Sequence, residues 1–373
     1  MSDDRITLLS GGGAAFEELL RLCGGARRSI DLNMFIWRDD EIGDRLGRAL
    51  LQAADRGVRV TVSKDRYGGV YERAEETGQS FWHKGPDPLC GAAGLALRCI
   101  VPADRRAPAV RQRPSPLAES LRRHPNVTVD AGRFKLDHSK YYVFDEETLV
   151  LGGVNVEDKE ITADITGAVY HDYMAEVRSA AEVRYFRDRL AGRAAYDPRR
   201  AVDYFFNGLS EGRRRFGILP GFLSVIAGAR RSLRIMMPYI GERRLNAALL
   251  QAAERGVEVL LVLPKKANLQ HDYNMRAAER LYRDSGGLIS VWLTPLMCHA
   301  KLMIADEDVV TLGSANMNRD ATSRGLELNC VSRDNGFVAA ALTDFEAHRA
   351  EAERHISFSY ARLPALLEGF YAG

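Results

Sequence analysis

The chain has little of what marks several common classes of protein. It contains no run of about 18 apolar residues, so the sequence predicts no helix that spans a membrane. The amino-terminal residues include no apolar segment typical of a secretory signal. The five cysteines are odd in number and scattered, which argues against a disulfide framework and against a zinc site. We therefore expect a cytoplasmic protein that folds without disulfides.

The chain also has almost no excess charge. Its formal net charge is +2 at neutral pH, so charge gives no general argument for nucleic-acid binding. Arginine-rich stretches occur, for example at 213–215, but such runs are usually solvated surfaces. Hydrophobic residues make up 46% of the 373, which is ample for the core of one large domain or two ordinary ones.

Two passages of the sequence occur twice. Residues 26–30 (Ala-Arg-Arg-Ser-Ile) are echoed at 229–233 (Ala-Arg-Arg-Ser-Leu), and residues 50–58 are echoed at 249–257. The passages lie in a succession of strand-like run, amphipathic helix and second strand-like run, which is the βαβ order of a mostly parallel sheet. The sequence therefore predicts an α/β protein made of two similar mixed-sheet halves.

A short motif is also duplicated. The first copy comprises His138, Lys140, Asp145 and Asn155, and the second comprises His299, Lys301, Asp306 and Asn316. Both copies have four residues between Lys and Asp, and 17 positions separate His from Asn in each. A single His-x-Lys would carry no information. Two copies with equal spacing, each inside an apolar run, are a strong signal.

Each copy of the motif is predicted to form a β-hairpin. Residues 141–144 and 302–305 predict strands, and residues two apart on a strand project from the same face, so His and Lys of each copy should point together. Asp145 and Asp306 begin polar breaks, and we interpret them as turn formers rather than catalytic groups. The small residues at the end of each hairpin would let the asparagine approach the site closely.

The two copies together supply the groups needed at a phosphodiester. One imidazole can attack phosphorus and the other can protonate the leaving alcohol, while the ammonium and carboxamide groups can bind the non-bridging oxygens. No ligand cluster accompanies them, so we expect no metal and no cofactor. One copy alone would more often contain a structural strand histidine, but a matched pair makes that alternative improbable. We expect one active site where two halves, 1–200 and 205–373, meet.

The duplicated His-x-Lys-x4-Asp motif, followed by Gly-Gly/Ser-x-Asn, resembles that of the phospholipase D superfamily. The resemblance implies two similar α/β halves around one site, a phosphohistidine intermediate, and acidic residues further along each half that orient the histidines. Asp172, 34 residues after His138, and Glu327, 28 residues after His299, occupy matching positions. The alternative for either acid is a solvated surface charge. The resemblance also implies that His138 is the nucleophile and His299 the general acid.

Further segments resemble bacterial phospholipase D-type cardiolipin synthases, and this similarity spans nearly the whole chain. These segments are 35–37 (Phe-Ile-Trp), 53–58, 238–239 (Pro-Tyr), 252–257 and 313–317. The resemblance implies a phosphatidyltransferase acting on a phospholipid such as phosphatidylglycerol, peripheral on the inner face of the cell membrane, with no obligatory nucleic acid. Two alternatives stay open: a phosphodiesterase that cuts nucleic acid, and an inactive binding module, against which the intact motifs count.

The two halves differ in length ahead of the motif. The echoed helix is displaced by 199 residues and the motif by only 161, so the first half holds 38 extra residues within 67–136. Phe81, Trp82 and Lys84 combine aromatic and basic groups suited to a membrane interface. We expect this insertion to contact lipid or to gate the substrate. The alternative is that the two aromatic residues pack on the core.

Three further expectations concern connections between elements. The three glycines at 11–13 predict a turn. Residues 192–220 predict the linker between the halves, and residues 342–371 predict a helix.

Overall fold

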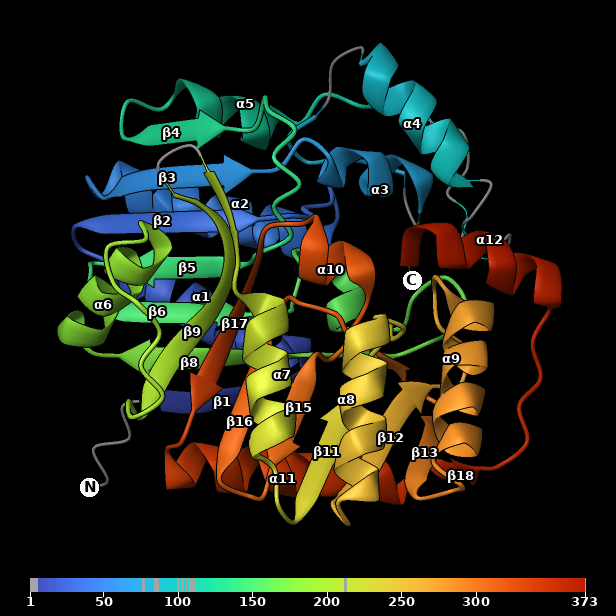
Figure 1. Cartoon of the computed structure of the whole chain (residues 1–373). Helices are drawn as coiled ribbons and strands as arrows, with labels where there is room; N and C mark the ends of the chain where they lie inside the picture. Colours follow the sequence, from blue (N-terminus) through green and yellow to red (C-terminus); the bar gives the residue numbers. More distant parts are fainter. Residues whose placement is uncertain are drawn as a thin grey trace.

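The fold is built on two large sheets (Figure 1). The structure is a computed structural model, and it describes residues 6–75, 78–83, 87–98, 101, 104, 106, 112–210 and 213–372. The first part of the chain forms β1 (Ile6–Ser10), α1 (Gly11–Gly25), β2 (Ser29–Met34), α2 (Glu41–Asp55), β3 (Arg59–Lys64), α3 (Gly68–Ala74), α4 (Pro88–Arg98), α5 (Pro116–Arg123), β4 (Val127–Asp130), β5 (Tyr141–Phe144), β6 (Thr148–Gly152), β7 (Tyr170–His171), β8 (Tyr173–Arg178) and α6 (Ala180–Leu190). The second part forms β9 (Val202–Ser210), β10 (Arg213–Phe216), α7 (Ile218–Gly228), β11 (Ser232–Met236), α8 (Arg243–Glu254), β12 (Glu258–Pro264), α9 (His271–Asp284), β13 (Ile289–Thr294), β14 (Met297–Cys298), β15 (Leu302–Ala305), β16 (Val309–Gly313), α10 (Arg319–Ser323), β17 (Glu327–Ser332), α11 (Asn335–Ala350), β18 (Glu353–His355) and α12 (Arg362–Ala372).

The two sheets share the arrangement of their central strands. One has the order β1-β8-β6-β5-β2-β3-β4, and the other has the order β10-β9-β17-β16-β15-β11-β12-β13-β18. In each sheet three strands run parallel, β2-β3-β4 and β11-β12-β13. The first strand of each motif hairpin pairs antiparallel with the first of these three. The predicted α/β fold of two similar mixed-sheet halves is confirmed.

The repeated passages fold into equivalent elements. Helix α2 begins after Asp40, whose carboxylate accepts a hydrogen bond from the N–H of Gly43, and α8 begins after Glu242, whose carboxylate accepts from the N–H of Leu245. Both helices bury an apolar stripe against their sheet and expose the opposite side. The strands that follow, β3 and β12, bury residues on the face covered by these helices.

Three apolar clusters form the core. The first lies between one sheet and helices α1 and α2, and the second between the other sheet and helices α7, α8 and α9. The third draws on both sheets, because Val143 and Leu149 belong to one cluster with Leu302 and Val310, together with side chains of α6 and α11. The halves therefore share a close-packed interface, which fixes the two motif hairpins relative to one another.

The aspartate of each motif anchors its hairpin. Asp145 and Asp306 have positive φ angles of 54° and 56°, a conformation that aspartate tolerates in tight turns. The Asp145 carboxylate accepts hydrogen bonds of 2.7–2.9 Å from the backbone N–H groups of residues 27–29. The Asp306 carboxylate accepts 2.7–2.9 Å bonds from residues 230–232 in the same way. Their interpretation as turn formers is confirmed, and they explain why the Ala-Arg-Arg-Ser passage occurs twice.

Of the three expectations about connections, the turn at 11–13 is wrong, while the linker at 192–220 and the helix at 342–371 hold only in part. Residues 11–13 begin α1 instead of forming a turn, and Gly12 fits where a Cβ atom would lie 2.1 Å from the backbone oxygen of Glu160. Much of 192–220 is strand: β9 pairs with β17 inside the second sheet, the position that β1 holds beside β8 in the first. Residues 342–371 divide among α11, β18 and α12. In each case tertiary packing outweighs local sequence preference.

Phe81 and Trp82 do not face lipid. Both are buried, with exposed fractions of 0% and 3%, and their rings lie 5.3 and 5.4 Å from the ring of Trp37. The lipid-contact hypothesis for these two aromatic residues is wrong, and the alternative of packing on the core is confirmed. Lys84 lies outside the described residues. The segment between β3 and β5 folds as α3, α4, α5 and β4.

Candidate active site

The two motif segments meet across the boundary between the halves. Strands β7 and β14 pair in parallel, and the N–H of His299 donates to the backbone oxygen of His171 at 2.8 Å. In the equivalent bridge, the N–H of His138 donates to the backbone oxygen of Leu326 at 2.9 Å. Each catalytic candidate is therefore held beside the acid-bearing segment of the other half.

His138 points into a pocket and is held from behind by two acceptors. Its Nδ1 lies 3.2 Å from the Oε2 atom of Glu327 and 3.2 Å from the backbone oxygen of Ser314. Because both neighbours accept, Nδ1 carries the proton, and Nε2 keeps its lone pair when the ring is neutral. Burial lowers the pKa of His138, and the nearby ammonium of Lys140 lowers it further. The neutral ring is thus favoured at neutral pH.

His299 has a mixed environment. Its Nδ1 lies 2.9 Å from the Oδ2 atom of Asp172 and 2.9 Å from the Nζ atom of Lys301, which is itself 3.0 Å from the same carboxylate oxygen. Burial and the Lys301 ammonium lower the pKa of His299 to about 4, although Asp172 acts in the opposite direction. Burial would raise the pKa of Asp172, but Lys301 and the His299 hydrogen bond hold it below its usual value.

The acids therefore orient the histidines across the two halves. Asp172, from the first half, pairs with His299, and Glu327, from the second half, pairs with His138. Both acids are buried, so the solvated surface charge is excluded as an alternative. Each acid contacts a motif histidine, but the spacing in the sequence gave no indication that the pairs join opposite halves.

Lys140 and Lys301 lie beneath the histidines, outside the set of residues that line the pocket. Both are fully buried, and each Nζ donates to the backbone oxygen of the histidine two positions earlier. Burial lowers the pKa of Lys140 to about 7. Direct contact between these ammonium groups and phosphate oxygens stays a prediction. In this arrangement they hold the histidine segments and supply positive potential from below.

The two motif asparagines face the pocket. Asn155 and Asn316 both line it, and they are only 3% and 6% exposed. The Oδ1 atom of each has no hydrogen-bond partner in the part of the chain that the structure describes. A buried carboxamide without a partner costs free energy unless a ligand or water satisfies it. This pair is therefore well suited to bind a polar substrate group.

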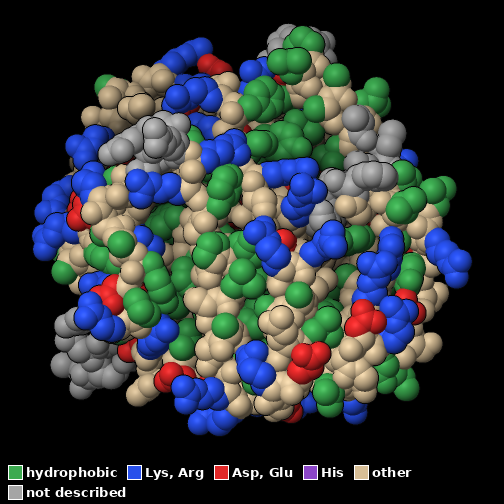
Figure 2. Space-filling model, viewed as in Figure 1, with side chains coloured by type: hydrophobic (Ala, Val, Ile, Leu, Met, Phe, Trp, Pro, Cys, Tyr) green, Lys and Arg blue, Asp and Glu red, His purple; other side chains and the backbone are tan. Residues whose placement is uncertain are grey.

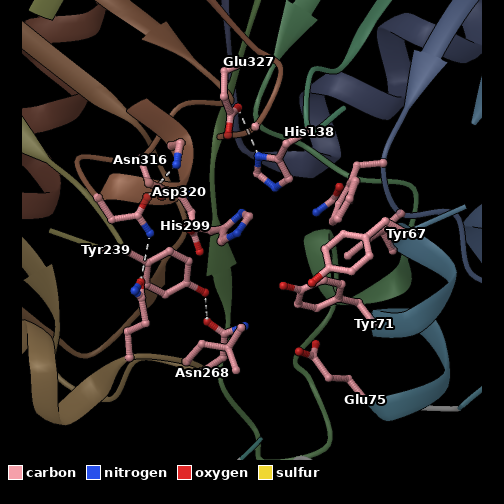
Figure 3. Close-up of a pocket in the computed structure, with 18 of the residues that line it drawn as sticks. Tyr67, Tyr71, Glu75, His138, Tyr239, Asn268, His299, Asn316, Asp320 and Glu327 are labelled. Carbon is pink, nitrogen blue, oxygen red and sulfur yellow. Dashed lines mark hydrogen bonds and ion pairs between the residues drawn. The ribbon is translucent and has the colours of Figure 1, made fainter. Parts of the chain in front are cut away.

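The pocket has a volume of about 420 Å³ and brings together polar side chains that the sequence analysis missed (Figure 3). They are Tyr67, Tyr71 and Glu75 from the first half and Tyr239, Asn268 and Asp320 from the second. The first three recur at intervals of four residues, which places them on one side of α3 and its ends. Their four-residue spacing in the sequence is the signal that could have identified these three residues. Tyr239 stood in a segment quoted for the resemblance, without a role.

A buried charge network supports one wall of the pocket. The Nζ atom of Lys159 lies 3.2 Å from Glu75 and 3.4 Å from Glu157, and Glu157 in turn pairs with Arg38 at 2.6 Å. Burial would lower the pKa of Lys159, but the carboxylates hold it well above its usual value. Paired charges of this kind keep their geometry because breaking either pair would leave a buried ion.

Comparison with known proteins places the chain in a family. Residues 19–181 and 222–349 match the family described as "Cardiolipin synthase, PLD-like domain". Cardiolipin synthase A of Pseudomonas aeruginosa is 25% identical, with 94% of this chain and 68% of that protein covered. Cardiolipin synthase B of Escherichia coli K12 is also 25% identical, with 90% and 78% covered. The crystal structure of phosphatidylserine synthase from Haemophilus influenzae has a similar fold, with a TM-score of 0.67 at 14% identity over 98% of this chain and 92% of that one. The chain therefore belongs to the phospholipase D-like family of enzymes.

Proposed function

We propose that the chain is a phosphatidyltransferase that works as cardiolipin synthases do, on a phospholipid such as phosphatidylglycerol. The observation that carries the proposal is the pair of histidines, His138 and His299, which face one pocket (Figure 3). A carboxylate lies behind the Nδ1 atom of each, Glu327 at His138 and Asp172 at His299. Relatives named cardiolipin synthase, which match nearly the whole chain, support a phospholipid as substrate. No cofactor enters the reaction.

The reaction has two steps of the same kind. In the first, Nε2 of His138 attacks phosphorus, a P–N bond forms, and the P–O bond to the head-group alcohol breaks. His299 gives its proton to the leaving oxygen. In the second, an acceptor hydroxyl attacks the phosphohistidine, His299 takes the hydroxyl proton, and the P–N bond breaks. Water in place of the alcohol gives hydrolysis.

The hydrogen bonds around the two rings support this division of roles. Both partners recorded for Nδ1 of His138 within the described residues are acceptors, so its Nε2 is ready to attack. His299 has a donor, Lys301, as well as the carboxylate of Asp172 at Nδ1, so the protonation of its ring depends on the balance between them. A phosphodiester anion bound in the pocket would add negative charge near His299 and raise its pKa from about 4, so that the acid forms when the substrate is present.

We also propose that residues 1–200 and 205–373 are the two structural units, with an insertion within 67–136. The strands of the seven-stranded sheet lie between positions 6 and 178, and those of the nine-stranded sheet lie between 202 and 355. This separation of the sheets along the chain supports a boundary near position 200.

We propose further that the enzyme lies on the inner face of the cell membrane through α4 and α12. Among the described residues, no helix combines the length and apolar character needed to cross a bilayer. Leu89 and Leu95 of α4 are 66% and 68% exposed, and Leu363, Leu366 and Leu367 of α12 are 66%, 52% and 56% exposed. Figure 2 shows apolar side chains in these two regions, at the top and upper right. Helix α4 packs on α3, and α12 packs on α9 and α10, so both adjoin elements at the pocket.

Lipid analysis tests the proposed reaction. The chain and its His138→Asn variant would be expressed in a bacterial host lacking its own cardiolipin synthases, and the lipids would be measured by mass spectrometry. We expect a new phosphatidyl-transfer product with the unchanged chain and none with the variant. If no phospholipid changes while the purified chain cuts single-stranded DNA or RNA in a His138-dependent way, the proposal is wrong and the nuclease alternative holds.

Vesicle binding tests the proposed membrane surface. Leu363→Ser, Leu366→Ser and Leu367→Ser together would remove most of the apolar face of α12. Binding to vesicles of phosphatidylglycerol should weaken by one to two orders of magnitude, since about 25 cal/mol is lost per Å² of apolar surface that leaves the lipid. Leu288→Ser is the matched control, because Leu288 is equally exposed, at 60%, but lies between α9 and β13. Equal weakening by both would exclude α12 as the contact.

A further inference from the structure

A cluster of two histidines and an aspartate lies outside the pocket, where the two halves meet. His171 comes from β7 of the first half, and Asp344 and His348 come from successive turns of α11 in the second. Each residue offers one ligand atom, and these three atoms lie within 4.8 Å of one another. His171 is buried, while Asp344 and His348 are half-buried.

The separations fit a transition-metal ion better than they fit hydrogen bonds. The Nε2 atom of His171 lies 3.3 Å, and the Nε2 atom of His348 lies 3.5 Å, from the Oδ2 atom of Asp344. Two ligands bound to tetrahedral Zn²⁺ at about 2.0 Å are about 3.3 Å apart. The two imidazole rings are adjacent, with centroids 4.0 Å apart, so both nitrogens converge on the same region as the carboxylate oxygen.

A second, independent feature points to a ligand at this position. Among the described residues, the buried Nε2 atom of His171 has no well-aligned hydrogen-bond partner, although it lies 3.3 Å from the Oδ2 atom of Asp344. The side chain is only 8% exposed, so water cannot readily satisfy this nitrogen. A buried imidazole nitrogen without a hydrogen bond, aimed at a carboxylate and a second imidazole, has the donor set that Zn²⁺ and related ions prefer.

The carboxylate is also held in place by its neighbours, as metal ligands usually are. Ser10 donates a hydrogen bond to Oδ1 of Asp344 at 2.8 Å, and the Tyr173 hydroxyl donates to Oδ2 at 2.6 Å. Ser10 and Tyr173 both belong to the first half, so Asp344 already reaches across the boundary. The three ligands are separated by up to 177 positions in the sequence, so no motif spacing reveals them.

We propose that His171, Asp344 and His348 bind a divalent transition-metal ion, for which Zn²⁺ is the probe. The ion connects β7 of the first half to α11 of the second and leaves one coordination position for water. The site is separate from the pocket, but His171 precedes Asp172, the partner of His299, and its backbone oxygen accepts the hydrogen bond of His299. An ion here stabilises the boundary on which the catalytic pairs depend.

Metal binding to the purified chain tests the proposal. After removal of metals with EDTA, Zn²⁺ would be titrated against a chromophoric competitor, and bound metal would be counted by mass spectrometry. We expect one ion per chain, a rise in the melting temperature on binding, and loss of saturable binding in His348→Asn. Co²⁺ bound to the unchanged chain should show the visible absorption of a tetrahedral nitrogen and oxygen site.

Two matched controls locate the ion. His355→Asn removes another half-buried histidine, close to α11 in sequence, and should retain one Zn²⁺. His138→Asn removes a pocket histidine and should also retain it. The proposal is overturned if the unchanged chain shows no saturable binding, or if His348→Asn binds as the unchanged chain does. Loss of the ion in His138→Asn alone would place it in the pocket and also overturn the proposal.

Discussion

Replacing Asp172 with asparagine separates the roles of the two histidines. Asp172 lies 2.9 Å from Nδ1 of His299 and partly offsets burial and Lys301, which together leave the pKa of His299 at about 4. Without the carboxylate this pKa falls further, and each unit makes the imidazolium tenfold rarer, at about 1.4 kcal/mol. The ring also loses the acceptor that sets its orientation. We expect the two effects to lower kcat by about 10²–10⁴-fold, or about 3–5 kcal/mol.

A comparison of two substrates with different leaving groups shows whether the rate lost in Asp172→Asn is due to loss of general acid catalysis. A head-group alcohol needs a proton as it departs, whereas p-nitrophenolate departs without one. The deficit of Asp172→Asn should therefore shrink by at least about tenfold on a p-nitrophenyl phosphodiester. Glu327→Gln acts on the nucleophile His138 instead, so its deficit should be equal on both substrates. An equal deficit of Asp172→Asn on both substrates would refute the assignment, and the reverse pattern would exchange the two roles.

Stability provides the control for this experiment. Asp172 is buried beside Lys301, so its loss should cost about 3 kcal/mol of folding free energy as well as activity. Glu176→Gln is a matched variant, since Glu176 is also a buried carboxylate of the β8 region and pairs with Arg178 at 2.7 Å, away from the pocket. It should lower the melting temperature yet keep its kcat within about twofold.

Three further predictions concern the intermediate, pH and the hairpins. Quenching during turnover with a denaturant at neutral pH, which preserves the acid-labile P–N bond, followed by peptide mass spectrometry should find a phosphatidyl group on His138; the same group on His299 would contradict the assigned roles. Lys301→Met should move the alkaline limb of kcat/KM to higher pH, because the lost ammonium lowers the pKa of His299 in the unchanged chain; an unmoved limb would show that His299 is not the acid. Asp145→Ala should cost about 2–3 kcal/mol of folding free energy, because three backbone N–H groups lose a charged acceptor, while kcat of the folded fraction stays near normal. Asp188→Ala removes only a surface ion pair with Arg193, so it should change stability by less than about 0.5 kcal/mol, and an equal loss in both would remove the anchoring role.

The duplication made the fold and the candidate site predictable. Local rules were enough for the hairpins, because apolar strands flank a turn that begins with Asp145 or Asp306. The same sequence repeat led to two equivalent sheets. The acids were found by their distance from the motif in the sequence, and burial of Asp172 and Glu327 agrees with a role at the site.

What sequence could not supply was information about contacts between distant segments. Phe81 and Trp82 pack against the ring of Trp37 in the core, although their local sequence suits a membrane interface equally well. Strand β9 completes the second sheet because β17 offers it a free edge, which the composition of 192–220 does not indicate. The cluster of His171, Asp344 and His348 forms because α11 packs beside β1 and brings two of its side chains next to His171.

Because the acids are exchanged between the halves, the two halves of this single chain depend on one another as the subunits of a dimer with shared active sites do. Each half carries a histidine that pairs with the other half's carboxylate. If the pairs have the proposed roles, we expect neither half to be a catalyst when expressed alone. Mixing separately produced halves would restore activity only to the extent that they reassemble. The exchange also constrains divergence after gene duplication: a change around His138 must be compatible with residues near Glu327, about 190 positions away. The two copies can therefore drift apart in substrate-binding loops, but they must change together at the acid–histidine pairs.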